Sequence, residues 1–316
     1  MVDEVIVPGY ANLVQSAAVQ QVQWQAFCAA PSADGMAKLR DAYHRTADAW
    51  SSIETIRYGP ISEDFRGERL SFWPERKNAV DKALKNILAK ADDAALEPTT
   101  FRKGSAGAQG LPALERLLFS EGTSEADFTG SADADFRCRL AKAIAGNVLA
   151  IAQEVQAGWA EGDGAIAHRL SAPEVSGPLK GALATDLLGG YVLLKDKKLD
   201  PVTGKDAESV RPRMAEGWRS GRSLRAMVLN LESAETVLTI LATGMPQGQS
   251  TALRNNATAL RVARRLSGDL GAIAAGPQRR DLILLRDAAD AAGKSALQEV
   301  PAVLGVTVGF NSLDGD

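Results

Sequence analysis

Trp50, Glu54 and Arg57 are the residues whose types and spacing most directly suggest chemistry. At positions i, i+4 and i+7 they would form one stripe near the end of a helix that we predict over residues 33–57. If the tryptophan turns this stripe inward, Glu54 and Arg57 lose contact with water and must pair with each other or with another group, because an unpaired buried charge is strongly destabilising. The alternative is an exposed ion pair worth about 0.3–0.5 kcal/mol. The spacing by itself favours this exposed pair.

A further carboxylate, Glu115, lies one turn into a short helix that we predict from Pro112 to Phe119. Proline suits the first turn of a helix, since no amide hydrogen bond is lost there. The helix dipole favours an acid near the same end. Local structure therefore accounts for Pro112 and Glu115 without any ligand.

His44 and His168 are the only histidines, and neither lies in a recognisable nucleophile motif. His44 shares a predicted helix face with Asp41 and Asp48, which could bind a metal ion weakly, but a solvated face with local charge pairing is the favoured interpretation. His168 lies in a polar stretch where a surface imidazole is expected. The sequence has no Walker loop, dinucleotide fingerprint or His-Glu-x-x-His pair.

The composition excludes several classes of protein. The 316 residues include 36 Lys and Arg against 39 Asp and Glu, so no basic excess is available to bind nucleic acid. No apolar run reaches the roughly 20 residues of a membrane-spanning helix. The first residues, 1–4, lack the basic and apolar regions of a secretion signal. The alternatives are a cytosolic protein and the mature part of an exported one.

Cys28 and Cys138 are the only cysteines, which excludes a four-cysteine zinc site within one chain. Two buried thiols and, in an oxidising compartment, a single disulfide are both compatible with the sequence.

Apolar residues recur at steps of three and four along most of the chain, which predicts helices. Three such faces are Val80-Leu84-Ile87-Ala91, Leu140-Ile144-Val148-Ile151-Val155-Trp159 and Leu282-Leu285-Ala289-Ala292-Ala296. We predict long helices over residues 9–30, 33–57, 74–92, 132–160, 173–199, 220–242, 250–275 and 279–300. This arrangement predicts an all-α fold of two up-down four-helix bundles, residues 1–160 and 161–316, packed together with a cleft between them.

Several motifs in the right order give the chain a family resemblance. They are Trp50-x-x-x-Glu54-x-x-Arg57-Tyr58-Gly59-Pro60, Phe72-Trp73-Pro74, Gly110-x-x-x-x-Glu115, Trp218-Arg219-Ser220-Gly221-Arg222-Ser223-Leu224, and the ending from Leu304 to Asp316. The chain resembles the imelysin-like family, whose members include the insulin-cleaving membrane protease and iron-regulated protein A. The resemblance implies a bacterial envelope protein, periplasmic or lipid-anchored, with a site between two helical bundles.

The family signature is Gly-x-His-x-x-Glu, in which the histidine and the glutamate could share a metal ion. Here it reads Gly110-Leu111-Pro112-Ala113-Leu114-Glu115, so a proline without a lone pair replaces the histidine. A hydrolytic zinc site usually needs three protein ligands and a water. We therefore expect no catalytic residues and no peptidase activity. A divergent metallopeptidase with a carboxylate-rich metal site is the alternative.

The resulting prediction is an envelope-associated binding protein with a polar inter-domain cleft, and the resemblance suggests a role in iron or nutrient handling. Its partner would be a small ligand, a metal ion or an envelope protein, and it would reach the membrane only through a lipid anchor. Glu54 and Glu115 are the candidates for a metal such as iron, calcium or zinc. A structural ion-pair network and a helical protein-interaction module are the competing interpretations. The predicted ligand-binding residues are Trp50, Glu54, Arg57, Gly110, Pro112, Glu115, Asp186, Ser220, Arg222 and Ser223.

Overall fold

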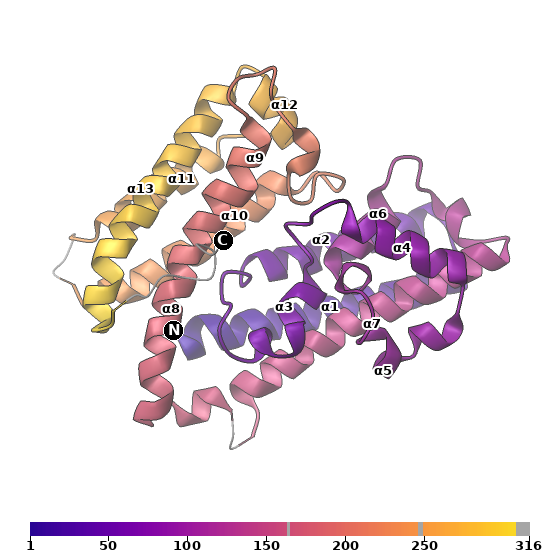
Figure 1. Ribbon diagram of the computed structural model, residues 1–316, viewed down its shortest axis with the longest axis horizontal. Helices are drawn as coiled ribbons and strands as arrows, with labels where there is room; N and C mark the ends of the chain where they lie inside the picture. Colours follow the sequence, from indigo (N-terminus) through magenta and orange to yellow (C-terminus); the bar gives the residue numbers. More distant parts are fainter. Residues whose placement is uncertain (163–164, 246–248, 308–316) are drawn as a thin grey trace. The chain divides into compact units, whose positions relative to one another are not determined.

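The computed structural model describes residues 1–162, 165–245 and 249–307, and all regular structure in those ranges is helical (Figure 1). The predicted all-α fold class is therefore confirmed. No helix in the described part of the chain combines the length and the apolarity that crossing a membrane requires. The predicted motif at the end of the chain lies outside the described residues from position 308 onward.

The chain packs into two compact units. The N-unit consists of Tyr10–Trp50 and Gly59–Gly158, and the C-unit consists of Met1–Gly9, Ser51–Tyr58 and Trp159–Asp316. The chain passes from the N-unit to the C-unit between Gly158 and Trp159, next to the predicted boundary after residue 160. The sequence gives no sign that the two short N-terminal segments belong to the C-unit.

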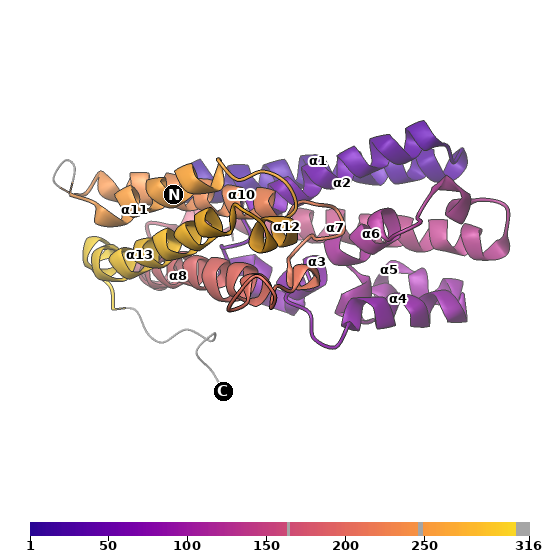
Figure 2. The ribbon, with the colours of Figure 1, turned by 90° about the horizontal axis from the view of Figure 1, so that it is seen from above.

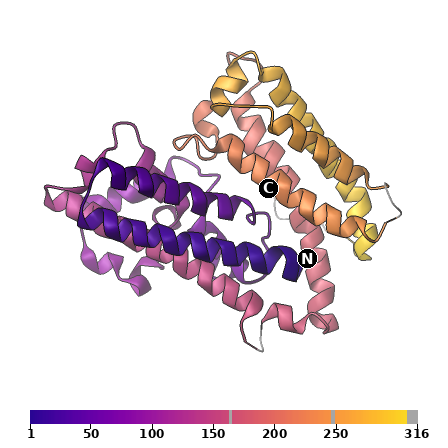
Figure 3. The same ribbon diagram turned by 180° about the vertical axis from the view of Figure 1, so that it is seen from behind.

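Long helices form the N-unit, and the apolar periodicity explains which faces they bury. In α7 (Ala132–Ala160) the predicted face from Leu140 to Val155 is completely buried. In α1 (Val7–Ala29) Leu13, Ala17 and Trp24 are completely buried at helical spacing. Figure 3 shows α1 beside α2 (Ala33–Ser51). The other α-helices of this unit are α3 (Arg66–Leu70), α4 (Ala79–Lys90), α5 (Pro98–Phe101) and α6 (Leu111–Phe119).

A disulfide between Cys28 and Cys138 ties α1 to α7, with 5.7 Å between the two Cα atoms. Next to it, the rings of Trp24, Phe27 and Phe128 pack edge to face or tilted, with centroids 5.2–6.1 Å apart. Of the two states that the sequence allowed for the cysteines, the structure contains the disulfide.

The C-unit is a second helical bundle. It contains α8 (Pro173–Val192), which continues as the π-helical turn η7 (Leu193–Leu199), and α9 (Asp200–Thr203), α10 (Ser223–Ala242), α11 (Thr251–Ala263), α12 (Leu270–Ala275) and α13 (Arg279–Leu304). The helix α13 packs against α8 and α11, and the three are seen side by side in Figure 2. All five residues of the predicted face Leu282–Ala296 are completely buried in this core.

Three predicted helices differ clearly from the structure. The helix expected over 74–92 forms only from Ala79 to Lys90. The helix expected over 250–275 is interrupted between α11 and α12, and the side chain of Asp269 caps the new start by accepting from the amide of Ala272. The helix expected over 33–57 ends at Ser51. Beyond it, the amides of Arg57 and Tyr58 both donate to the carboxylate of Asp186, instead of continuing a helical ladder. The prediction of one helical stripe through Trp50, Glu54 and Arg57 is therefore wrong.

Candidate functional site

The segment Ser51–Tyr58 carries the first predicted site residues of the C-unit, and Asp186 on α8 holds its end. One carboxylate oxygen of Asp186 accepts from the Arg57 amide at 2.8 Å and from the Tyr58 amide at 3.0 Å. Burial raises the pKa of Asp186 to about 6, and the two amides and the Arg57 charge offset only part of this effect. Asp186, which was predicted from the sequence, thus contacts the segment Ser51–Tyr58 through the main-chain amides of that segment.

Lys198 is the centre of a buried polar cluster in the same unit. It lies on η7 with 2% of its surface exposed, and its ammonium group contacts the carboxylate of Glu54. It also lies 2.7 Å from a carboxylate oxygen of Glu216 and 2.7 Å from the amide oxygen of Asn230. One lysine therefore joins two acids and an amide that are distant in the sequence.

Asn230, on α10, completes the enclosure of Glu54. Its side-chain amide nitrogen lies 2.7 Å from the Glu54 carboxylate and 2.7 Å from the main-chain oxygen of Ser51. The acid and the end of α2 are thus fixed by the same side chain. Since Glu54 is 2% exposed, these partners replace the water that the carboxylate loses.

The loop before α10 contributes Arg222, which is 6% exposed and donates to the hydroxyl of Ser51 at 3.3 Å. Gly217 leaves room for the Arg222 side chain, because a Cβ atom at position 217 would lie 2.6 Å from it. The φ angle of Gly217, 61°, also favours glycine. Ser220 donates to the Gly217 carbonyl at 3.1 Å, and the hydroxyl of Ser223 is buried with no hydrogen-bond partner among the described residues.

The cluster carries two acids, Glu54 and Glu216, and two bases, Lys198 and Arg222. Burial alone lowers the pKa of Lys198, but Glu216 and Glu54 outweigh it, so the pKa is raised and the ammonium form is favoured. Burial and the charge of Glu54 raise the pKa of Glu216, against the opposing charges of Lys198 and Arg222. In the structure Lys198 contacts the carboxylates of both Glu54 and Glu216.

The other predicted site residues belong to the N-unit. Gly110 precedes α6, where a Cβ atom would lie 2.2 Å from the carbonyl oxygen of Leu70, so only glycine fits. Pro112 occupies the first turn of α6, as predicted. Glu115 is buried one turn later, and Trp50 is buried near the end of α2. The structure therefore divides the predicted site residues between the two units.

The metal prediction rests on Glu54 and Glu115, which lie in different units. Within the described ranges, no group of three or more His, Cys, Asp and Glu side chains could hold a metal ion. The His44 ring packs beside Phe119, with centroids 5.2 Å apart, and Nδ1 of His168 lies 2.9 Å from the Gly162 carbonyl oxygen. The predicted metal stays a prediction.

Sequence reasoning missed Lys198, Glu216 and Asn230. Lys198 falls in the charged run Lys195-Asp196-Lys197-Lys198, which predicts a solvated surface. Asn230 could have indicated a buried polar cluster, since it interrupts an otherwise apolar stretch from Ala226 to Leu231. A buried Glu54 was expected to pair with Arg57 or with another group, and in the structure its partner is Lys198. Arg57 is exposed, and its Nε donates to the main-chain oxygen of Glu54 at 3.1 Å.

Comparison with known proteins covers nearly the whole chain. The imelysin (peptidase M75) family model matches residues 6–302. Iron-regulated protein A from Synechococcus elongatus is 29% identical over 120 residues, which is 38% of this chain and only 30% of that protein. Two crystal structures share the fold at 18% identity. An imelysin-like protein from Psychrobacter arcticum has a TM-score of 0.80 over 98% of this chain and 94% of its own. A putative iron-regulated protein A precursor from Parabacteroides distasonis has a TM-score of 0.76 over 96% and 92%.

Proposed function

Because this chain belongs to the imelysin family, we propose that it is a ligand-binding protein of the cell envelope that acts in iron or other nutrient handling and does not cleave peptides. The ligand would contact polar groups that the Lys198 cluster holds in place. These are the segment Ser51–Tyr58 and the loop that carries Ser220, Arg222 and Ser223. Two further parts of the proposal remain predictions. They are the cleft itself and the contribution to ligand binding of the N-unit residues Gly110, Pro112 and Glu115.

The pairing of Glu54 with Lys198 is the observation that carries this proposal. A hydrolytic metal centre usually takes three protein ligands and leaves a position for water. Glu54 is already neutralised by an ammonium group and fixed by Asn230. At the signature position, Pro112 has no lone pair to offer a metal. Both features favour binding over hydrolysis.

The disulfide between Cys28 and Cys138 supports the envelope location. Structural disulfides persist in oxidising compartments such as the periplasm and are rare in the cytosol. The solved relative from Parabacteroides distasonis is described as a precursor, which agrees with export of that protein. The association with iron comes from the names of the iron-regulated relatives.

Binding can be tested through the thermal stability of the purified protein. Ferric citrate, calcium and zinc are added in separate titrations, and a ligand that binds the folded state raises the melting temperature in a saturable way. We expect such a shift with at least one of the three, and we expect Glu115→Gln to reduce it. The matched control is Glu121→Gln, which neutralises an exposed acid just after α6. If no titrant shifts the melting temperature, the binding proposal fails.

The absence of peptidase activity is tested separately. The purified protein is incubated with several denatured and native protein substrates, with and without a chelator, and the products are separated by mass spectrometry. We expect intact substrates in every case. Cleavage that stops on chelation and returns with added metal would instead establish the divergent metallopeptidase.

A further inference from the structure

The N-unit contains a pocket whose lining residues are all different from those assigned to the proposed site. Its volume is about 420 Å³. Typical small-molecule sites have volumes of about 300–1,000 Å³. Residues of α1, α3 and α7 line it, together with the segment from Leu96 to Arg102 that includes α5. All of these residues belong to one unit, so the pocket is formed within a single packed body.

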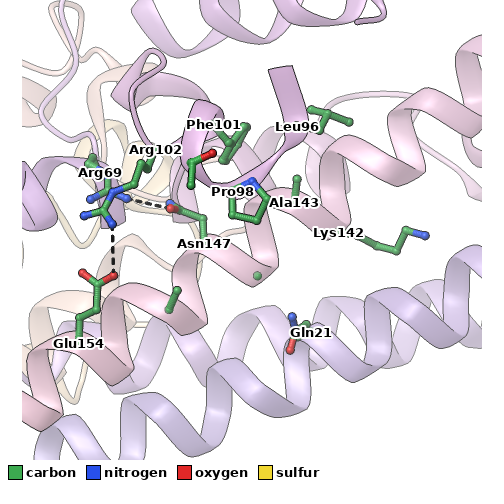
Figure 4. A pocket seen from close by; sticks show the side chains of 13 residues that line it. Gln21, Arg69, Leu96, Pro98, Phe101, Arg102, Lys142, Ala143, Asn147 and Glu154 are labelled. Carbon is green, nitrogen blue, oxygen red and sulfur yellow. Dashed lines mark hydrogen bonds and ion pairs between the residues drawn. The ribbon is translucent and has the colours of Figure 1, made fainter. Parts of the chain in front are cut away.

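Small side chains on one face of α7 leave the space open. Ala143, Gly146 and Ala150 recur at steps of three and four and line the pocket. Leu96, Pro98 and Phe101 supply apolar surface on another wall, as Figure 4 shows. The pocket can therefore contact an apolar body as well as a polar group.

Arg69 is the unusual residue of this pocket. It is 6% exposed, yet within the described part of the chain it has no carboxylate at ion-pair distance. Its Nε donates to the side-chain oxygen of Gln109 at 2.8 Å, and its Nη2 donates to the side-chain oxygen of Asn147 at 2.9 Å. Both partners are neutral, so the charge of the guanidinium group is not balanced by them.

The two amide partners are themselves held in position. The Gln109 side-chain nitrogen donates to the Gly104 carbonyl at 2.9 Å, and the Asn147 side-chain nitrogen donates to the Gln109 carbonyl at 3.0 Å. These bonds turn both amide oxygens toward Arg69. The guanidinium is thereby fixed, and its Nη1 has no hydrogen-bond acceptor among the described residues.

The acids nearby are engaged with two other arginines. Glu154 lies 2.8 Å from Arg66 through one oxygen and 3.8 Å from Arg102 through the other. Asp64 lies 3.2 Å from Arg102. Burial, followed by the charges of Arg102 and Arg66, lowers the pKa of Arg69 against the opposing charges of Glu154 and Asp64. Arg69 and Arg102 lie together at one side of the pocket, and Lys142 lies at the other (Figure 4).

We propose that this pocket binds a small organic carboxylate, with Arg69 pairing the carboxylate and the apolar wall contacting the rest of the molecule. A planar guanidinium matches a carboxylate through two parallel hydrogen bonds. A bound anion supplies the counter-charge that Gln109 and Asn147 do not. The combination of one fixed cation and an apolar wall selects a charged group attached to an apolar body.

Three probes separate the contributions of charge and apolar surface. Naphthoate carries both, naphthalenemethanol carries the same rings without charge, and inorganic phosphate carries charge without rings. Binding to the purified full chain is followed by calorimetry and by NMR line broadening of the probe at millimolar concentrations. We expect naphthoate to bind at least about tenfold more tightly than either other probe, since hydrogen bonds to charged groups are the stronger ones.

Two variants test the location. Arg69→Gln is expected to weaken naphthoate binding by about tenfold or more, while Ala150→Leu fills the pocket without changing any arginine and should abolish binding. The control is Gln153→Leu, which adds the same side chain at an exposed position of α7 outside the pocket and should bind as the unmodified protein does. Absence of naphthoate binding, equal binding of the neutral probe or of phosphate, or unchanged affinity in Ala150→Leu would each overturn the proposal.

Discussion

Lys198 in the C-unit and Arg69 in the N-unit are both buried cations, with 2% and 6% of their surfaces exposed, but their surroundings differ. Lys198 contacts the carboxylates of Glu54 and Glu216, so its charge is balanced inside the protein. Among the described residues, the Arg69 side chain donates hydrogen bonds to the amides of Gln109 and Asn147 alone, and it lines a pocket. A buried cation with acidic partners has its charge already balanced, whereas one with neutral partners beside open space can receive an anion.

The largest effect is expected from removing the balanced cation. Lys198→Met removes the cation that contacts both Glu54 and Glu216, and losing one member of a buried ion pair typically destabilises by about 3–5 kcal/mol. The free energy of unfolding of the C-unit is measured by denaturant titration with circular dichroism and tryptophan fluorescence. A loss below about 1 kcal/mol would show that the acids become neutral or hydrated without penalty.

The disulfide provides the corresponding test for the N-unit. It joins residues 110 positions apart, and replacing both Cys28 and Cys138 by alanine is expected to lower the free energy of unfolding by about 2–4 kcal/mol. Calorimetry should show the loss in the transition of the N-unit, with little change in that of the C-unit. An equal shift of both transitions would mean that the two units unfold together.

Asp186 is expected to make the stability of the C-unit depend on pH. Its pKa is raised from 3.8 to about 6 by burial, so the folded state binds its proton more tightly than the unfolded state does. Its stabilising contribution is complete below about pH 4 and is lost as the pH rises through about 6, a change of about 2 kcal/mol after allowance for partial exposure. Asp186→Asn keeps an oxygen for both amides and should remove this slope. Identical slopes in the two proteins between pH 4 and 7 would contradict the assignment.

The smallest stability effect is expected at the unbalanced cation. Arg69→Gln leaves no buried acid behind, and the loss of two hydrogen bonds to neutral amides is offset by removing a desolvated charge, so the change should be about 1 kcal/mol or less. The measurement is the free energy of unfolding of the N-unit, made in parallel with Lys198→Met. A loss as large as that of the lysine variant would show that Arg69 has a structural role like that of Lys198.

The sequence predicted the helices well where packing follows local periodicity. The buried faces of α7 and α13 were predicted residue by residue, because a three-to-four spacing of apolar side chains can bury only one side of a helix. The end of α2 was not predicted, because it depends on Asp186 accepting the amides of Arg57 and Tyr58 from a distant helix. No local pattern encodes such a partner.

The candidate site follows the same division. Asp186 and Arg222 were predicted from the sequence, and both contact the segment Ser51–Tyr58, which carries the predicted Glu54. Lys198 was missed because its charged neighbours predict exposure. The structure places it on the inner side of the π-helical turn η7, where it is buried.

The sequence by itself determined the family, the helical fold and the loss of a coordinating side chain at Pro112, because these depend on residue type and on spacing along the chain. Only the tertiary structure decided how the buried charges are balanced. Ion pairing depends on distances of a few ångströms between residues as far apart in the chain as Glu54 and Lys198, and folding alone sets those distances.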